Sequence, residues 1–162
     1  MSEHKNDLFK NIVAVRETSM RKGQKKSFSF KLKSSTDQIT KTVQKFDELL
    51  ERANCCTARE KSELSTALSE ALANAIIHGN KTQPEKTVFI NLQILFNKIE
   101  ITVRDEGTGF DPTKIDNPLK PENLKKTKGR GIYLMKLFMD RVNFKRVKNG
   151  MKVTLVKNLQ KT

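Results

Sequence analysis

The chain has 162 residues, 36% of them hydrophobic, and a formal net charge of +14 at pH 7, which suits one domain with a sizeable core and excludes two catalytic domains. No apolar run approaches the roughly 18–20 residues of a membrane-spanning helix, and the N-terminus lacks the apolar segment of a secretory signal, so we expect a cytoplasmic protein without a membrane anchor. Two adjacent cysteines and two histidines provide no set of zinc ligands.

The first elements predicted are an arm, a strand and a helix. Residues 1–25 are polar, end in the basic run RKGQKK and predict a mostly flexible N-terminal arm. Apolar and polar residues alternate over Ser27–Lys33, which is the period of a half-buried strand. Apolar residues at helical spacing over Thr36–Ala53 predict a helix.

A long second helix follows. Thr57 and Glu60 match a capping box that opens a helical pattern running to about His78, where Gly79-Asn80 is a fitting end. One face of this helix is apolar and predicted to lie in the core. A separate polar stripe beside it consists of Glu63, Glu70, Asn74 and His78.

The second half of the chain predicts a sheet around a long loop. Val88–Phe96 and Ile99–Arg104 alternate and are joined by two residues, which indicates an antiparallel hairpin. Residues 105–128 show neither helical nor strand periodicity, and loops of this length are usually functional or mobile. The remaining predicted elements are a helix over Gly131–Asp140 and strands over Arg141–Val147 and Met151–Lys157. The predicted fold is α+β, with residues 26–162 forming one domain.

The polar stripe of the long helix offers a candidate site. Glu70 and Asn74 lie one helical turn apart, so a carboxamide oxygen directed at Mg²⁺ and a carboxylate acting on a hydroxyl would lie a few Å apart. An ordinary solvated helix face explains the same stripe equally well. His78 is better explained as a structural residue at the helix end.

Two glycine-rich segments supply further candidates. In DEGTGFD, Asp105 follows a strand, and its carboxylate can accept a hydrogen bond from an exocyclic amine, while Gly107 and Gly109 let the backbone approach a planar ligand. In KGRGIYLM, Gly129 and Gly131 precede a helix whose N-terminal N–H groups favour an anion. Taken singly, the first segment is better explained as a plain turn between two elements, and the second is a weak signal.

The order of these three segments resembles the order of motifs in the ATP-binding domain of the gyrase, histidine-kinase and MutL (GHKL) superfamily. In that superfamily they are the N box and two glycine boxes, which here span Ser69 to Met135. The resemblance implies a Bergerat-type two-layer α/β sandwich, with helices on one face of a mixed, mainly antiparallel sheet. It also implies that the chain binds ATP with Mg²⁺.

More specifically, the segment SEALANAIIHG and the pattern GxGxxxMxxxMD resemble the corresponding motifs of the anti-sigma-factor serine/threonine kinases. The resemblance implies that Glu70 is the general base, that Asn74 is the Mg²⁺ ligand and that Asp105 recognises adenine. The other implied nucleotide-binding residues are Gly107, Gly109, Lys128, Gly129, Arg130, Gly131 and Thr154, the last supporting the adenine-binding aspartate. The lysine- and proline-rich loop between the glycine boxes departs from the family pattern.

Two functions follow as hypotheses. The first is a protein serine/threonine kinase that phosphorylates a STAS-type anti-anti-sigma partner, binds a sigma factor and forms a homodimer. The second is a non-catalytic switch whose ATP occupancy controls the binding of a partner. Residues 112–162 hold 14 Lys/Arg against 3 Asp/Glu, but charge alone predicts no specific nucleic-acid binding.

Overall fold

The computed structural model describes residues 16–20, 25–109, 111–114, 119–123 and 129–160. Six strands form one sheet in the order β1-β2-β3-β4-β6-β5, and every neighbouring pair is antiparallel. The strands are β1 (Arg16–Met20), β2 (Lys25–Lys33), β3 (Thr87–Ile94), β4 (Lys98–Arg104), β5 (Arg141–Val147) and β6 (Gly150–Asn158).

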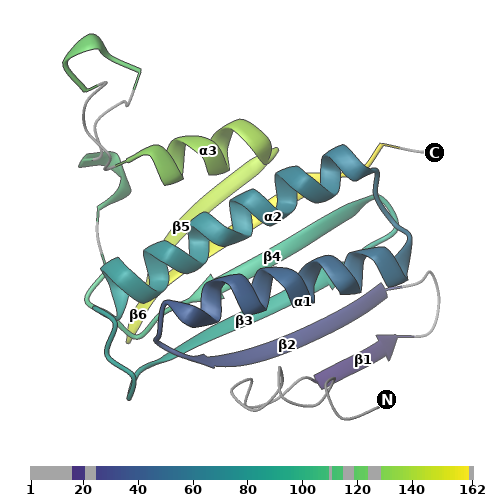
Figure 1. Ribbon diagram of the computed structural model, residues 1–162, viewed down its shortest axis with the longest axis horizontal. Helices are drawn as coiled ribbons and strands as arrows, with labels where there is room; N and C mark the ends of the chain where they lie inside the picture. The colour runs from purple at the N-terminus through teal and green to yellow at the C-terminus, as the bar shows by residue number, and fades with distance from the viewer. Residues whose placement is uncertain (1–15, 21–24, 110, 115–118, 124–128, 161–162) are drawn as a thin grey trace.

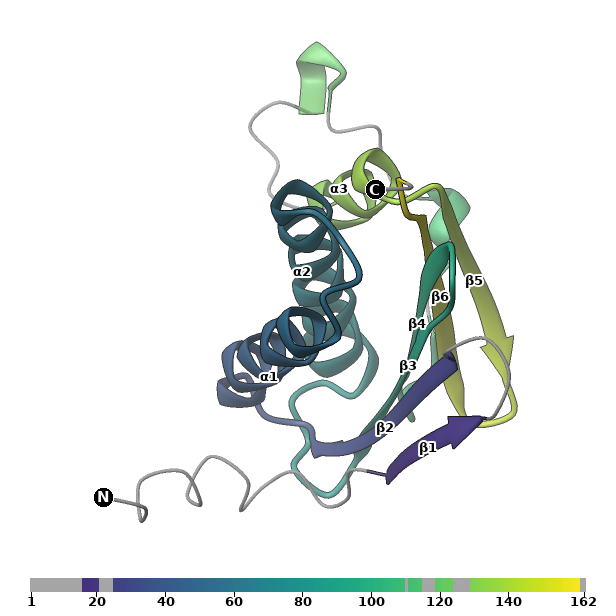
Figure 2. The same ribbon diagram turned by 90° about the vertical axis from the view of Figure 1, so that its right-hand side faces the viewer.

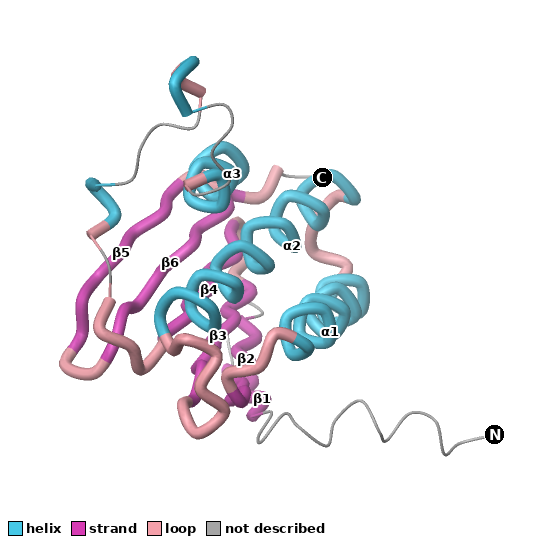
Figure 3. The backbone as a smooth tube through the Cα atoms, turned by 60° about the vertical axis from the view of Figure 1, so that its left-hand side comes forward, coloured by secondary structure: helices cyan, strands magenta, loops and turns pink. Residues whose placement is uncertain are grey.

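Three α-helices lie together on one face of this sheet (Figures 1 and 2). The helices are α1 (Asp37–Ala53), α2 (Ala58–Ala73) and α3 (Arg130–Phe138). A π-helical segment, η2 (Asn74–Gly79), continues α2, and two short 3₁₀ turns, η3 (Pro112–Lys114) and η4 (Pro121–Asn123), lie in the long loop before α3. The central helix is α2, which packs against both α1 and α3 (Figure 3).

The core lies between the helices and the sheet. Alternate residues of β3 and β4 are buried, as the period of a strand covered on one side requires. Leu64, Leu68 and Leu72 of α2 are fully buried against them, and each such side chain contributes about 1.5–3 kcal/mol relative to an exposed one. This packing fixes which face of α2 is left for a site.

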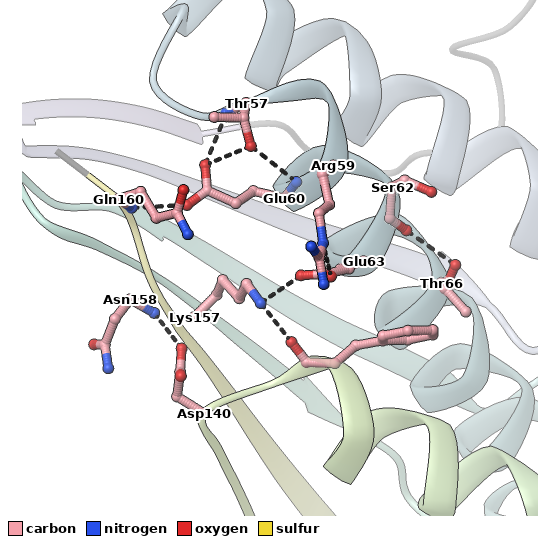
Figure 4. Close-up of polar contacts among 11 residues, drawn as sticks. Thr57, Arg59, Glu60, Ser62, Glu63, Thr66, Asp140, Lys157, Asn158 and Gln160 are labelled. Carbon is pink, nitrogen blue, oxygen red and sulfur yellow. Dashed lines mark hydrogen bonds and ion pairs between the residues drawn. The ribbon is translucent and has the colours of Figure 1, made fainter. Parts of the chain in front are cut away.

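The start and the flank of α2 are fixed by polar contacts (Figure 4). The predicted capping box is present, since Glu60 N donates to Thr57 Oγ1 at 3.2 Å and Thr57 N donates to Glu60 Oε2 at 2.8 Å. Glu63 pairs with Lys157 of β6, whose ammonium also donates to the carbonyl of Phe138 at 2.8 Å. One lysine therefore joins the last strand to α2 and to the end of α3.

The structure corrects three predictions about the fold. Arg16–Met20 forms β1 and pairs with β2, so the prediction of a flexible arm is wrong for that segment, while residues 1–15 and 21–24 lie outside the described part. The sheet has only antiparallel pairs among its described strands, where a mixed sheet was expected. The long second helix changes from α to π geometry at Asn74.

Within the described ranges, the structure contains no helix whose length and apolar character would let it cross a membrane.

Candidate functional site

Glu70 and Asn74 lie at the C-terminal end of α2, one turn apart, where the helix changes its geometry. From Asn74 onward the backbone is π-helical, and Asn80 N donates to the carbonyl of Ala75, five residues back, at 2.8 Å. Single π-helical turns inside helices are frequent at functional sites, because they redirect the side chains around them. The sequence pattern gave no sign of this change.

Glu70 meets the second glycine box across the fold. A Cβ added at Gly131 would collide with Oε2 of Glu70. Gly131 belongs to the first turn of α3, whose N-cap residue, Gly129, has a left-handed φ of 88° and provides no side-chain cap. The first N–H groups of a helix have no partner within it. A carboxylate and an anion-binding helix terminus therefore face each other.

Asp105 is a buried carboxylate held in place by the backbone. Its side chain is only 3% exposed, and one oxygen, Oδ1, accepts the backbone N–H of Gly107 at 2.9 Å and of Met151 at 3.1 Å. Burial raises the pKa of this carboxyl, and the two N–H donors offset only part of that shift. The second oxygen, Oδ2, accepts no hydrogen bond from the described residues and can accept one from a ligand.

Glycines surround Asp105 because the backbones around it approach too closely for side chains. A Cβ at Gly79 would collide with Asp105 Oδ2, and a Cβ at Gly107 would collide with the carbonyl of Gly79. Gly150, with φ at 132°, lies against the carbonyl of Asp105. Of these three glycines only Gly107 was predicted as a site residue; Gly79 and Gly150 were interpreted as a helix end and a turn.

Asn80 joins the end of the helix to the loop that carries Asp105, and sequence reasoning missed it. Its side chain is fully buried. Its Oδ1 accepts Glu106 N at 2.7 Å, and its Nδ2 donates to the carbonyl of Thr87 at 3.1 Å. The Glu106 carboxylate in turn accepts Thr87 N at 2.6 Å. The position of Asp105 therefore depends on this asparagine.

Asn74 has an amide suited to holding a metal ion. Its Nδ2 atom is buried and has no hydrogen-bond partner in the described chain. A buried amide without a partner is costly, and the choice between its oxygen and nitrogen positions is an assignment, not an observation. Either orientation leaves a polar atom for a ligand, and the oxygen is a donor that Mg²⁺ accepts. Asn74 therefore fits one ligand position of a Mg²⁺ ion.

The two clusters lie at opposite ends of one helical segment. Glu70 and Gly79 are nine residues apart on α2 and η2, which corresponds to roughly 13 Å along a helix axis. Glu70 lies by the anion-binding end of α3, and Gly79 lies by Asp105. This spacing suits a ligand with a planar amine-bearing group at one end and an anion at the other.

Thr154 lies away from the position predicted for it, Lys128 lies outside the described residues, and Arg130 lies at the predicted helix start. Thr154 does not support Asp105. It pairs with Thr102 on the open side of the sheet and lies three residues beyond Met151, about 10 Å along the strand. The backbone N–H of Met151 supports Asp105 instead. Arg130 is exposed at the start of α3.

Gly109 lies at the end of the first glycine box, beside a cation that sequence reasoning did not single out. It has a left-handed φ of 77°, and an added Cβ would lie 3.4 Å from a guanidinium nitrogen of Arg146 on β5. Only the pairing of β5 with β6 brings this arginine to the loop.

Comparison with known proteins finds related domains and related chains. Residues 32–157 match the family model of the histidine kinase-like ATPase domain. An anti-sigma F factor of Anoxybacillus flavithermus is 39% identical over 111 residues, which cover 65% of this chain and 75% of the relative. One of Halalkalibacterium halodurans is 43% identical over 90 residues, covering 53% and 60%. One of Clostridium perfringens is 38% identical over 108 residues, covering 64% and 76%.

Proposed function

This chain belongs to the histidine kinase-like ATPase family, and on that premise we propose that it is an anti-sigma factor that transfers the γ-phosphoryl group of ATP to a serine or threonine of a protein. The contact between Glu70 and Gly131 is the single observation that carries the proposal. It supports a proton acceptor beside the helix terminus where phosphates bind, and a nucleotide binder that performs no chemistry has no need of one.

Adenine binds at Asp105. Oδ2 accepts a hydrogen bond from the exocyclic amine, while Oδ1 is held by Gly107 N and Met151 N. Because one oxygen is fixed by the backbone, the other has a defined direction before the nucleotide arrives, and the loss of conformational entropy on binding is small.

The phosphates bind at the N-terminus of α3. Gly129 and Gly131 bring backbone N–H groups close to the anion, and the side chains of Lys128 and Arg130 add positive charge. Asn74 holds Mg²⁺ through its side-chain oxygen. When bound, the ion neutralises charge on the phosphate oxygens and helps to align them for transfer.

Glu70 receives the proton of the attacking hydroxyl. A Ser or Thr hydroxyl is a weak nucleophile until its proton is removed, and a positioned carboxylate contributes typically 10²–10⁴-fold to such a step. Phosphoryl transfer otherwise depends on positioning and charge neutralisation, which the residues around Asn74 and α3 supply.

The names of the relatives, which are anti-sigma F factors, support a sigma factor as a partner. In this proposal the chain works in the cytoplasm, binds a sigma factor as a homodimer and phosphorylates a STAS-type anti-anti-sigma protein. Phosphorylation of that protein prevents it from displacing the sigma factor.

The test is transfer of label from γ-labelled ATP to a purified STAS-type protein, with wild type, Glu70→Gln and Glu63→Gln compared. Glu63 belongs to the same polar stripe of α2 but is paired with Lys157, so it is a matched control. We expect Glu70→Gln to lower the transfer rate at least 10²-fold with nucleotide affinity within about threefold of wild type, and Glu63→Gln to retain transfer.

Normal transfer by Glu70→Gln would contradict the role of Glu70. If wild type transfers no label but ATP still changes its affinity for a sigma factor, and Glu70→Gln leaves that change intact, the chain is the non-catalytic ATP-dependent switch.

A further inference from the structure

The face of the sheet opposite the helices carries an ordered row of positive charge. No described helix covers this face (Figure 2). The strand registers align one residue from each of five neighbouring strands across it. This set, the cationic row, consists of Lys31, Phe89, Arg104, Lys152 and Lys145.

The four cations of the row are closely spaced. Adjacent strands lie about 4.8 Å apart, so the row extends for roughly 19 Å. Arg104 lies directly opposite Lys152, and Lys152 directly opposite Lys145. Like charges in directly opposed positions destabilise a sheet. The folded protein therefore loses stability by keeping this arrangement.

No described carboxylate forms an ion pair with a member of the row, and the carboxylate of Glu106, two residues beyond Arg104, accepts a hydrogen bond from Thr87 N instead. The ion pairs of the described residues lie within α1, within α2, between α1 and α2, in the loop at Asp111 and Lys114, and between Lys157 and Glu63. Glu100 is on the same face, but it is four residues from Arg104 along β4, which is about 13 Å. The row is thus a concentrated field directed at solvent.

Uncharged polar side chains border the row. The next aligned set across the same five strands is Ser29, Asn91, Thr102, Thr154 and Asn143. Charged and hydrogen-bonding groups therefore lie side by side on one face of the sheet. Such a surface fits a partner that combines carboxylates with polar groups.

Phe89, the aromatic member of the row, argues against single-stranded nucleic acid as the ligand of this face. Sheet surfaces that bind single strands offer aromatic rings on which bases stack. Here the Arg104 guanidinium carbon lies 4.2 Å from the centroid of the Phe89 ring, and Lys31 Nζ lies 5.7 Å from it. The ring is already covered by cations, so a base would have to displace them.

A second copy of the chain is also disfavoured on this face. Two copies related by a twofold axis would bring their cationic rows toward each other, and like-charge juxtaposition at an interface is costly.

The spacing of carboxylates along one face of a helix matches the spacing of the cations in the row. Side chains three and four residues apart on a helix are about 5–6 Å apart, close to the separation of neighbouring strands. We propose that the open face of the sheet is a docking surface for a protein helix that carries a stripe of carboxylates and lies across the strands. This surface is on the other side of the sheet from the nucleotide site, and it does not depend on phosphoryl transfer.

The probe is a fluorescent 18-residue Ala/Gln helical peptide with four glutamates at positions i, i+4, i+7 and i+11. Its binding to the full chain is compared with that of an isomer whose glutamates are distributed around the helix, and with a single-stranded DNA of 14 nucleotides. We expect the one-face peptide to bind about tenfold more tightly than its isomer and more tightly than the DNA.

Two triple variants locate the binding. In Lys31→Gln/Lys145→Gln/Lys152→Gln the row loses three charges, and in Lys41→Gln/Lys45→Gln/Lys61→Gln the helical side loses the same number. Three exposed ion pairs together account for about tenfold in affinity, so we expect that loss in the first variant and less than threefold loss in the second. Nucleotide affinity should be unchanged in both, which separates this proposal from the proposed function.

Equal losses in the two triple variants, tighter binding of the DNA, or equal affinity for the two peptides would each overturn the proposal. So would a change in the oligomeric mass of the sheet variant in light scattering, which would assign the face to a second copy. Because the substitutions relieve repulsion, the melting temperature of the sheet variant should not fall. Backbone amide shifts in β4 and β6 on addition of the peptide give a readout that needs no variant.

Discussion

The carboxylate of Asp105 divides its two oxygens between the protein and the ligand. Oδ1 accepts two backbone N–H groups, and Oδ2 points to where Gly79 leaves space. An asparagine at this position can keep the first arrangement while placing an N–H donor where Oδ2 lies now. In the proposed adenine site, the choice of base would therefore depend on one atom.

Asp105→Asn should reverse part of the base preference. We expect the affinity for ATP to fall about 10- to 100-fold, since a hydrogen bond to a charged group contributes about 1.5–3 kcal/mol. ITP has a carbonyl where ATP has the exocyclic amine, so the affinity of the variant for ITP should fall less than its affinity for ATP, or should rise. Isothermal titration of wild type and variant with both nucleotides measures this. Burial raises the pKa of Asp105, so removing the charge should not lower the melting temperature.

Thr154→Val is the matched control for that experiment. Thr154 was expected to support Asp105, but it faces the open side of the sheet. Its replacement should leave the affinity for ATP within about twofold of wild type. A loss comparable to that of Asp105→Asn would show that the support from Met151 N is not sufficient.

At the scale of elements, the π-helical end of α2 is the feature that the sequence did not reveal. A 100° periodicity predicts one helix over the whole segment to His78, and a local hydrophobic pattern does not show that the backbone changes from α to π geometry at Asn74. β1 was missed for a related reason: a short polar segment with basic neighbours becomes a strand only because β2 offers it an edge.

Asn80→Ala tests how the η2 segment positions the adenine pocket. The change leaves Glu106 N and the Thr87 carbonyl without their partner, and each unsatisfied buried group costs about 1–3 kcal/mol. We expect the free energy of unfolding to fall by about 2–4 kcal/mol in urea titrations, together with a loss of affinity for ATP. Asn143→Ala, on the exposed part of β5, should change neither quantity measurably.

At the scale of the molecule, the last strand is tied to the helical layer by Lys157. Its ammonium contacts Glu63 on α2 and the carbonyl of Phe138 at the end of α3 (Figure 4). The hydrogen bond from Lys157, followed by that from Arg59, holds the pKa of Glu63 below its usual 4.5. Elements far apart in the chain are thereby coupled through one ammonium group.

This coupling predicts how stability depends on pH. A carboxyl whose folded pKa is lowered contributes stability that is present above its unfolded pKa and is lost as the pH falls through the folded value. Glu63→Gln should therefore lower the free energy of unfolding by about 1 kcal/mol at neutral pH and by less below pH 4.5. Urea unfolding across this range measures the difference. An equal effect at every pH would mean that packing, not the ion pair, is responsible.

The sequence by itself determined the number of main helices, five of the six strands and the capping box of α2. These features depend on local periodicity and on residues a few positions apart, which a single chain displays directly. It also predicted Glu70, Asn74, Asp105 and the glycine boxes as a set, because their order along the chain resembles a known family. Their individual roles stay predictions.

Tertiary structure alone decided which of these residues meet. Glu70 and Gly131 are brought together by the packing of α2 on α3, and Asp105 meets Met151 through the pairing of β4 with β6. It also decided that Thr154 faces away and that four cations align on the open face. Contacts between residues distant in sequence depend on strand order and register, which no local pattern encodes.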